Sequence, residues 1–295
     1  MKSGVHIVRF DLPGWPGSLA STIADVGRAS EAAGLDNLSV MDHYFQMEPY
    51  GGSASPMLEG YTTLGFLAAH TSTVELQLLV TGVTYRHPGL LAKIVTTLDV
   101  LSGGRAMLGI GAAWYEREHL ALGVPFPPLS ERFERLEETL QIVHQMWSED
   151  DGPYDGRHYR LGETINVPQA ITRPHPPIMI GGSGERKTLR LVAAYADACN
   201  IFAGPQSGPD AVRAKLDILA EHCEREGRAF DDIRRTILWT GPLDPSPTEG
   251  AAFVEEMARF VAAGVEEVHI MPPGDDPVGW IARFGENVVP GLREI

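Results

Sequence analysis

The sequence is poor in cysteine and has no long hydrophobic run. Its only cysteines, Cys199 and Cys223, form no closely spaced pair, so we expect two buried thiols of a reducing compartment and no disulfide framework. No apolar run reaches the ~18 residues that a membrane-spanning helix needs. The N-terminal segment enters a strand pattern without a signal-peptide core. We therefore predict a cytoplasmic protein without a membrane partner.

Positive charge is also scarce. The chain has 24 Lys and Arg residues against 39 Asp and Glu residues, which gives a net charge of −15. Because no long basic stripe is present to replace the counterions of phosphates, a nucleic-acid partner is not expected. The excess of negative charge is typical of a soluble protein. Hydrophobic residues make up 43% of the chain, which is enough for a large core and argues against disorder.

Strand and helix patterns alternate along the whole chain. Short β-branched or apolar runs, each followed by a segment of helical periodicity, predict strands at 5–10, 38–41, 76–83, 107–110, 178–180, 198–202, 236–239 and 267–271. Eight strand–helix units in order predict an α/β fold, a (β/α)8 TIM barrel that forms one domain over residues 1–295. A doubly wound sheet is the alternative, but it would normally have fewer units and a nucleotide fingerprint near the start.

The alternation breaks between residues 149 and 177. This segment contains Pro, Gly and Tyr without a sustained period. We interpret it as an excursion inserted between the strand-four helix and strand five, carrying one hairpin and no second hydrophobic core.

A glycine turn follows the fifth predicted strand. In the stretch IMIGGSGERK, residues 178–187, an apolar run ends at Gly181, Gly182 and Gly184, and Arg186 and Lys187 follow. Backbone N–H groups exposed at such a turn bind phosphate well, and glycines remove the side chains that would block the approach. An ordinary strand-to-helix turn is the alternative interpretation.

Chemistry-bearing residues also end the neighbouring strands, at the edge of a barrel where functional residues lie. Strand two ends in Asp42 and His43, and strand four ends in a run of small residues before Trp114. Strand three ends in TGVT, residues 81–84. Small residues on three neighbouring strands make room for a flat ligand. Alternatively they only ease packing, and His43 is a hydrogen-bonded core histidine.

Four stretches carry a family resemblance: SVMDHYF, TGVTYRHPGLLAK, TLDVLSGGRAMLGIGAAWYEREH and PPIMIGGSGERKTLRLVAAYADACN. Together they resemble the luciferase-like monooxygenase superfamily, specifically its F420-dependent oxidoreductase branch. The stretches are spread across the chain in the expected order. The sugar-phosphate dehydrogenases of that branch carry a glutamate where this chain has Trp114, so we do not expect oxidation of glucose 6-phosphate.

The resemblance implies roles for individual residues. It implies that the glycine turn holds the cofactor phosphate, that a non-proline cis peptide at Gly82–Val83 supports the deazaflavin ring, and that His43 moves a proton. The implied cofactor-binding residues are Asp42, Thr81, Gly82, Val83, Ala112, Ala113, Gly181, Gly182, Ser183 and Gly184. The expected substrate-binding aromatics are Trp15, Tyr44, Phe45, Trp114 and Trp239. Core packing is an open alternative for Trp239.

The resemblance also implies the reaction. Coenzyme F420 exchanges a hydride at its C5 atom with a small organic substrate such as an enone, an imine, a carbonyl compound or an alcohol. One alternative is an FMN-dependent monooxygenase that uses oxygen, and another is a barrel that binds the cofactor without catalysis. We expect a homodimer, a small-molecule substrate and no metal site.

Overall fold

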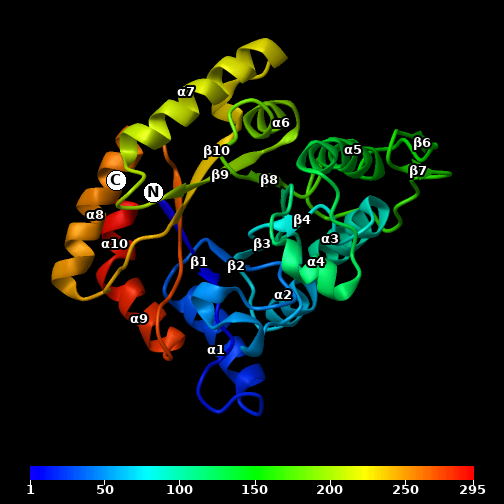
Figure 1. Ribbon diagram of the computed structural model, residues 1–295. Coiled ribbons are helices and arrows are strands. Elements are labelled where there is room, and N and C mark those ends of the chain that lie inside the picture. Colours follow the sequence, from blue (N-terminus) through cyan, green and yellow to red (C-terminus); the bar gives the residue numbers. More distant parts are fainter.

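The computed structural model describes residues 1–295, and its parallel strands close into a ring (Figure 1). The strands of the ring are β1 (Lys2–Ile7), β2 (Asn37–Val40), β3 (Glu75–Leu78), β4 (Thr81–Gly82), β5 (Ala106–Gly111), β8 (Ile178–Gly181), β9 (Ala198–Ala203), β10 (Arg234–Trp239) and β11 (Glu267–Ile270). β1 pairs with both β2 and β11, and a β3–β5 pairing completes the circle. Because β3 and β4 are two segments of one barrel strand, both paired with β5, the prediction of an eight-stranded α/β barrel is confirmed.

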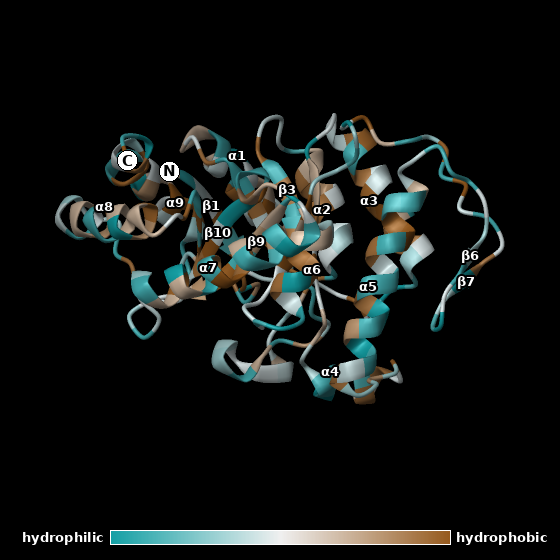
Figure 2. Cartoon of the chain, turned by 90° about the horizontal axis from the view of Figure 1, so that it is seen from above, coloured by the Kyte–Doolittle hydropathy of each residue, from teal (hydrophilic) through white to brown (hydrophobic).

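Helices surround the strands, and α3 and α5 show the alternating hydrophobic and hydrophilic bands of amphipathic helices (Figure 2). The helices are α1 (Leu19–Ala32), α2 (Gly60–Ala68), α3 (Pro88–Ser102), α4 (Glu116–Leu122), α5 (Leu129–Met146), α6 (Thr188–Tyr195), α7 (Pro209–Glu226), α8 (Pro247–Ala262), α9 (Pro277–Asn287) and α10 (Val289–Arg293). Short 3-10 turns lie at η1 (Glu48–Tyr50), η2 (Gly52–Ala54) and η3 (Phe230–Asp232). No helix is both long enough and apolar enough to cross a bilayer.

Strand three differs from its prediction. The sequence predicts one strand over residues 76–83, but the pairing stops after Leu78 and resumes at Thr81 in β4. The cis peptide bond that is not before proline joins Leu79 to Val80, so its expected position at Gly82–Val83 was wrong. The apolar run is continuous through the break, and therefore hydrophobic pattern alone could not locate it.

The excursion after α5 contains the expected hairpin, formed by β6 (Tyr154–Asp155) and β7 (Arg160–Leu161). The hairpin lies outside the helix ring, beyond α5 (Figures 1 and 2). Farther along the excursion, the buried Asp99 of α3 accepts hydrogen bonds from the backbone N–H groups of Ile171 and Thr172, at 2.6 and 3.0 Å. This carboxylate fixes the returning end of the excursion against the barrel.

One large cluster of 61 buried side chains fills the space between the strands and the helices. Cys199 and Cys223 belong to it and are unpaired thiols, as the sequence predicts. Tyr159, from the excursion, also packs into this cluster. Burial on this scale supplies most of the stabilisation, at roughly 25 cal/mol per Å² of apolar surface.

Candidate active site

A cavity of about 640 Å³ opens at the carboxyl ends of the strands. Its lining is largely hydrophobic and includes residues from most strands of the ring. Among the predicted site residues, those that line it are Asp42, His43, Thr81, Gly82, Ala112, Ala113, Trp114, Gly181 and Gly182. The structure therefore brings together segments that are far apart in the sequence, and we call this space the mouth cavity.

His43 follows β2 and is held by a carboxylate. Its Nδ1 lies 2.7 Å from Oε1 of Glu118, a residue of α4 that is fully buried. The imidazole packs edge-on against the rings of Trp114 and Tyr115, with centroid distances of 5.6 Å in both cases. Because Glu118 occupies Nδ1, the Nε2 atom is the one left for a ligand in the mouth cavity.

Glu118 accepts hydrogen bonds from two segments of the chain. Its Oε2 accepts the backbone N–H groups of Tyr44 and Phe45, at 2.7 and 3.0 Å, and the Tyr85 hydroxyl donates to Oε1. Burial raises the pKa of this carboxyl, but the hydrogen bonds from His43, Tyr85 and Phe45 together hold the pKa below its ordinary value. Glu118 is therefore an ionised anchor for the loop after β2.

The helix that carries Glu118 also fixes Tyr85. The neighbouring His119 stacks on the Tyr85 ring at a centroid distance of 4.4 Å. Nδ1 of His119 is 2.8 Å from the carbonyl oxygen of Tyr115, which can only accept, so Nε2 accepts from the Thr84 hydroxyl at 2.6 Å. These contacts close α4 over one side of the mouth cavity.

Asp42 ties two strand ends together. Its carboxylate accepts the backbone N–H of Gly82 at 3.0 Å and both guanidinium nitrogens of Arg86, at 2.7 and 3.0 Å. Burial raises the pKa of Asp42 and the Arg86 charge opposes that shift. Since protein donors already occupy both oxygens, Asp42 shapes the wall that it lines.

Glycines and alanines form the wall on the side of β5 and β8. A Cβ atom at Gly111 or Gly181 would lie 3.0 Å from the Val80 side chain, so both glycines leave room for Val80. Ala113 has a φ of 58°, in the left-handed region that favours glycine. Its carbonyl oxygen, and that of Ala112, accept hydrogen bonds from the Arg132 guanidinium, which fixes this turn.

A second hollow, of about 450 Å³, adjoins the glycine turn. It is lined by Phe133, Lys215 and the segment from Ser183 to Thr188, and we call it the cationic hollow. Lys215 is paired with Glu185, whereas Arg186 and Lys187 form no ion pair and are exposed. Helix α6 begins only at Thr188, so the predicted phosphate turn is a loop ahead of the helix.

A third hollow, of about 560 Å³, extends the mouth cavity on the opposite side, at β1, β10 and β11. It shares Val8, Pro49, Tyr50, Thr240 and Met271 with the mouth cavity. Its one cation, Arg9, is paired with Asp11 and Asp275 at 2.9 and 3.2 Å. We call it the side hollow. It offers no free positive charge.

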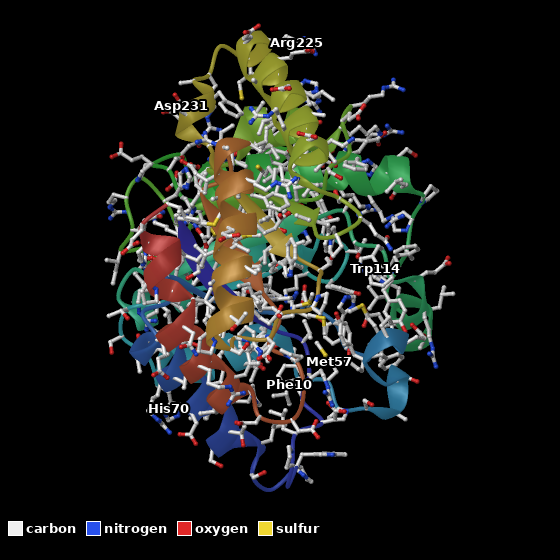
Figure 3. All side chains as sticks on the ribbon, turned by 90° about the vertical axis from the view of Figure 1, so that its left-hand side faces the viewer. Phe10, Met57, His70, Trp114, Arg225 and Asp231 are labelled. Atoms are coloured by element: carbon white, nitrogen blue, oxygen red, sulfur yellow. The ribbon has the colours of Figure 1, made fainter.

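Several predicted site residues lie away from the mouth cavity. Trp239 is buried between the barrel and α8, edge-on to Phe253 at 5.5 Å, so the core interpretation describes its position. Trp15 is half exposed on the loop after β1 and does not line the cavity. Tyr44, Phe45 and Val83 are not part of the lining, and Tyr44 packs edge-on against Tyr85, which is. Trp114 does line the cavity and is 63% exposed near the edge of the molecule (Figure 3).

Sequence reasoning missed several polar residues of the site, of which Glu118, His6 and Asn200 matter most for the chemistry. Glu118 was hidden because α4 was not predicted, although an acidic residue in the run WYEREH could have signalled a partner for His43. His6 on β1 and Asn200 on β9 line the floor of the mouth cavity. The sequence signal for His6 and Asn200 was a polar residue within an otherwise apolar strand.

Comparison with known proteins identifies a family. A family model described as luciferase-like monooxygenase matches residues 5–268. An F420-dependent glucose-6-phosphate dehydrogenase of Kineococcus radiotolerans is 33% identical, with 92% of this chain and 93% of the relative covered.

Solved structures share the fold. The coenzyme F420 dependent tetrahydromethanopterin reductase of Methanopyrus kandleri superimposes with a TM-score of 0.79 at 18% identity, covering 99% of both chains. The oxygenating constituent of 3,6-diketocamphane monooxygenase of Pseudomonas putida, in complex with FMN, gives a TM-score of 0.77 at 14% identity, with 98% of each chain covered. Because proteins that bind different flavin-like cofactors share this barrel, the fold alone does not determine which cofactor binds.

Proposed function

Since the chain belongs to the luciferase-like monooxygenase family, we propose that it binds the ring of coenzyme F420 in the mouth cavity and the phosphate in the cationic hollow. It is an F420-dependent oxidoreductase. The observation that carries the proposal is that adjacent residues of one loop line the two spaces. Gly182 lines the mouth cavity and the next residue, Ser183, lines the cationic hollow.

The residues present fit this cofactor. A tricyclic ring needs an apolar slot, and the wall at Gly111 and Gly181 has no side chain. A phosphate needs backbone donors and positive charge, which the loop from Ser183 to Thr188 supplies with Arg186 and Lys187. Two other cations near the mouth cavity are already neutralised, because Arg86 is paired with Asp42 and Arg9 with Asp11.

The chain's own contribution to the reaction is proton transfer. When bound, F420 exchanges a hydride with the substrate at C5 of its ring. His43 keeps its Nδ1 against Glu118, so its Nε2 exchanges the matching proton with the substrate in the mouth cavity. Trp114 and Tyr115 pack edge-on against the His43 imidazole and limit its rotation. Glu118 acts through His43 as a positioning residue.

We infer a neutral substrate. The mouth cavity is lined mainly by apolar side chains, and the only charged residue in its lining, Asp42, is neutralised by Arg86. The side hollow offers Arg9 only in a pair with Asp11 and Asp275. A sugar phosphate would therefore lose water without gaining a cation. An enone, an imine, a ketone or an alcohol suits these walls.

Spectroscopic titration tests the cofactor, because F420 and FMN have different absorbance spectra. Tight binding of F420 and weak binding of FMN supports the proposal, and the reverse result points to the monooxygenase alternative. Turnover of the F420-loaded protein with a panel of enones, imines, ketones and alcohols, with glucose 6-phosphate included, then separates an enzyme from a carrier. Turnover of glucose 6-phosphate alone would refute the neutral-substrate inference. A homodimer and a cytoplasmic location stay predictions, to be checked by light scattering and cell fractionation.

A further inference from the structure

Two polar side chains at the floor of the mouth cavity have no part in the proton transfer. His6 on β1 is 2% exposed and Asn200 on β9 is 4% exposed, and both line the cavity. Each makes one side-chain hydrogen bond through one polar atom. The other polar atom of each side chain, Nε2 of His6 and Oδ1 of Asn200, has no partner in the protein.

The Ser39 hydroxyl fixes the tautomer of His6. Its Oγ lies 3.0 Å from Nδ1 of His6 and 3.3 Å from the carbonyl oxygen of Val5. A hydroxyl has one hydrogen and a carbonyl oxygen can only accept, so Ser39 donates to Val5 and accepts from Nδ1–H of His6. Nε2 of His6 is then a hydrogen-bond acceptor. Burial lowers the pKa of His6 to about 3, with His269 and His43 adding to the shift, so the ring is neutral.

The Thr236 hydroxyl orients Asn200 in the same manner. Its Oγ1 lies 2.9 Å from the carbonyl oxygen of Cys199, to which it donates, and 2.8 Å from Nδ2 of Asn200, from which it accepts. The amide NH₂ of Asn200 therefore faces Thr236, and its Oδ1 is the free atom. Two independent hydroxyls thus leave the floor with two free acceptors, Nε2 of His6 and Oδ1 of Asn200, while Thr236 holds one N–H of the Asn200 amide.

We propose that His6 and Asn200 form an acceptor subsite at the floor of the mouth cavity, which selects a substrate carrying a hydroxyl or N–H group at its deep end. The inference rests on the proposed function. His6 lies on β1, next to β2, the strand that ends in the proton-transferring His43, whereas Asn200 lies on β9, where it pairs with Gly181 of the glycine wall. The donor that reaches His6 therefore comes from the substrate, which binds on the side of His43. A ligand without a donor leaves both buried acceptors unpaired, which opposes its binding.

Paired ligands of similar shape test this selection. Cyclohexanol has a hydroxyl donor and cyclohexanone has only an acceptor, so dissociation constants of both are measured by NMR titration on the F420-loaded protein. The parent is expected to favour the alcohol, and His6→Leu is expected to reduce this preference by roughly 3- to 10-fold, the range for one hydrogen bond. If His6→Leu prefers the alcohol over the ketone as strongly as the parent does, the proposal is overturned.

Two further variants keep both floor residues in place, so the test does not depend on the folding of His6→Leu alone. Ser39→Ala and Thr236→Val release the tautomer of His6 and the amide of Asn200, and each should reduce the preference for the alcohol without removing a lining residue. Nitrogen-15 NMR of histidine-labelled parent protein should show His6 neutral, with its proton on Nδ1. A proton on Nε2 contradicts the proposal, even where His6→Leu fails to fold.

Titration of F420 into the same proteins separates this inference from the function on which it rests. If the parent does not bind F420, the proposed function fails. If the parent binds F420 and the variants bind it equally well, the effect on the alcohol belongs to the substrate, as proposed. If F420 affinity falls and the preference for the alcohol does not change, the donor belongs to the cofactor and the substrate subsite is refuted.

Discussion

Replacement of His43 separates the reaction from the binding of the cofactor. His43→Ala removes the imidazole that Glu118 holds against the mouth cavity. We expect the turnover rate to fall by about 10²- to 10⁴-fold, the usual contribution of a general acid or base. F420 affinity should change much less, because the cationic hollow is built by another segment. Steady-state rates and a binding titration on one preparation measure both quantities. Parental turnover would remove His43 from the reaction.

Glu118 links the loop after β2 to α4, and its charge makes that link depend on pH. Its pKa is lower in the folded protein than the ordinary value of 4.5, so ionised Glu118 stabilises the fold above that value and the stabilisation is lost as pH falls through the folded pKa. Glu118→Gln should lower the free energy of unfolding at pH 7 by about 1 to 3 kcal/mol. The difference from the parent should shrink below about pH 4.5. Denaturant unfolding of parent and variant at several pH values measures this difference in the free energy of unfolding. A difference that does not depend on pH would contradict the assignment of Glu118 as an ionised anchor.

At the residue scale the sequence predicted part of the site. His43 and the glycines were recognisable because they end predicted strands. Glu118 and the floor pair His6 and Asn200 were not, because their roles depend on side chains that meet between neighbouring strands or between a loop and a helix. The contacts that orient them join residues more than 30 positions apart in the chain.

Among the elements, the loop between β8 and α6 allows a direct test of phosphate binding. Gly182 has a φ of 114°, so a larger residue there would strain the backbone, and removing charge is the cleaner experiment. The double variant Arg186→Ala, Lys187→Ala should weaken F420 binding by roughly 10- to 100-fold with little loss of stability, because both side chains are exposed. Arg225→Ala, on α7, is the matched control. Unchanged affinity in the double variant would place the phosphate elsewhere.

A carboxylate of α3, Asp99, holds the returning end of the excursion. Asp99→Asn removes the charge that holds the N–H groups of Ile171 and Thr172, and should cost about 1.5 to 3 kcal/mol. Hydrogen exchange should accelerate in residues 165–176, since these amides lose their anchor. Asp155→Asn in the exposed hairpin is the control and should change little. Parental exchange rates in Asp99→Asn would show that other contacts hold the excursion.

Element boundaries were predictable where a periodic pattern ended at Gly or Pro, as at Pro88 and Gly103 around α3. The break after Leu78 lies inside an unbroken apolar run, and α4 is too short, at 7 residues, to show helical periodicity. Both features border the mouth cavity. Local pattern was therefore least informative next to the site, where tertiary contacts decide the backbone path.

For the whole molecule, the order of eight strand–helix units was sufficient to predict a closed barrel. We expect barrel and excursion to unfold in one cooperative step, because Tyr159 of the excursion packs into the main cluster. Calorimetry should give equal calorimetric and van't Hoff enthalpies. Two resolved transitions would instead show that the excursion is a separate unit.

The two hollows on opposite sides of the mouth cavity have a kinetic consequence. The cationic hollow lies at β8 and the side hollow at β1, β10 and β11, across the ring of strands. One ligand can therefore enter by its own route while the other is already in place, and neither has to leave first. Initial rates at varied concentrations of cofactor and substrate should give intersecting double-reciprocal lines, the pattern of a reaction that passes through a ternary complex. Parallel lines, the pattern of a ping-pong reaction, would mean that the two routes are not used together.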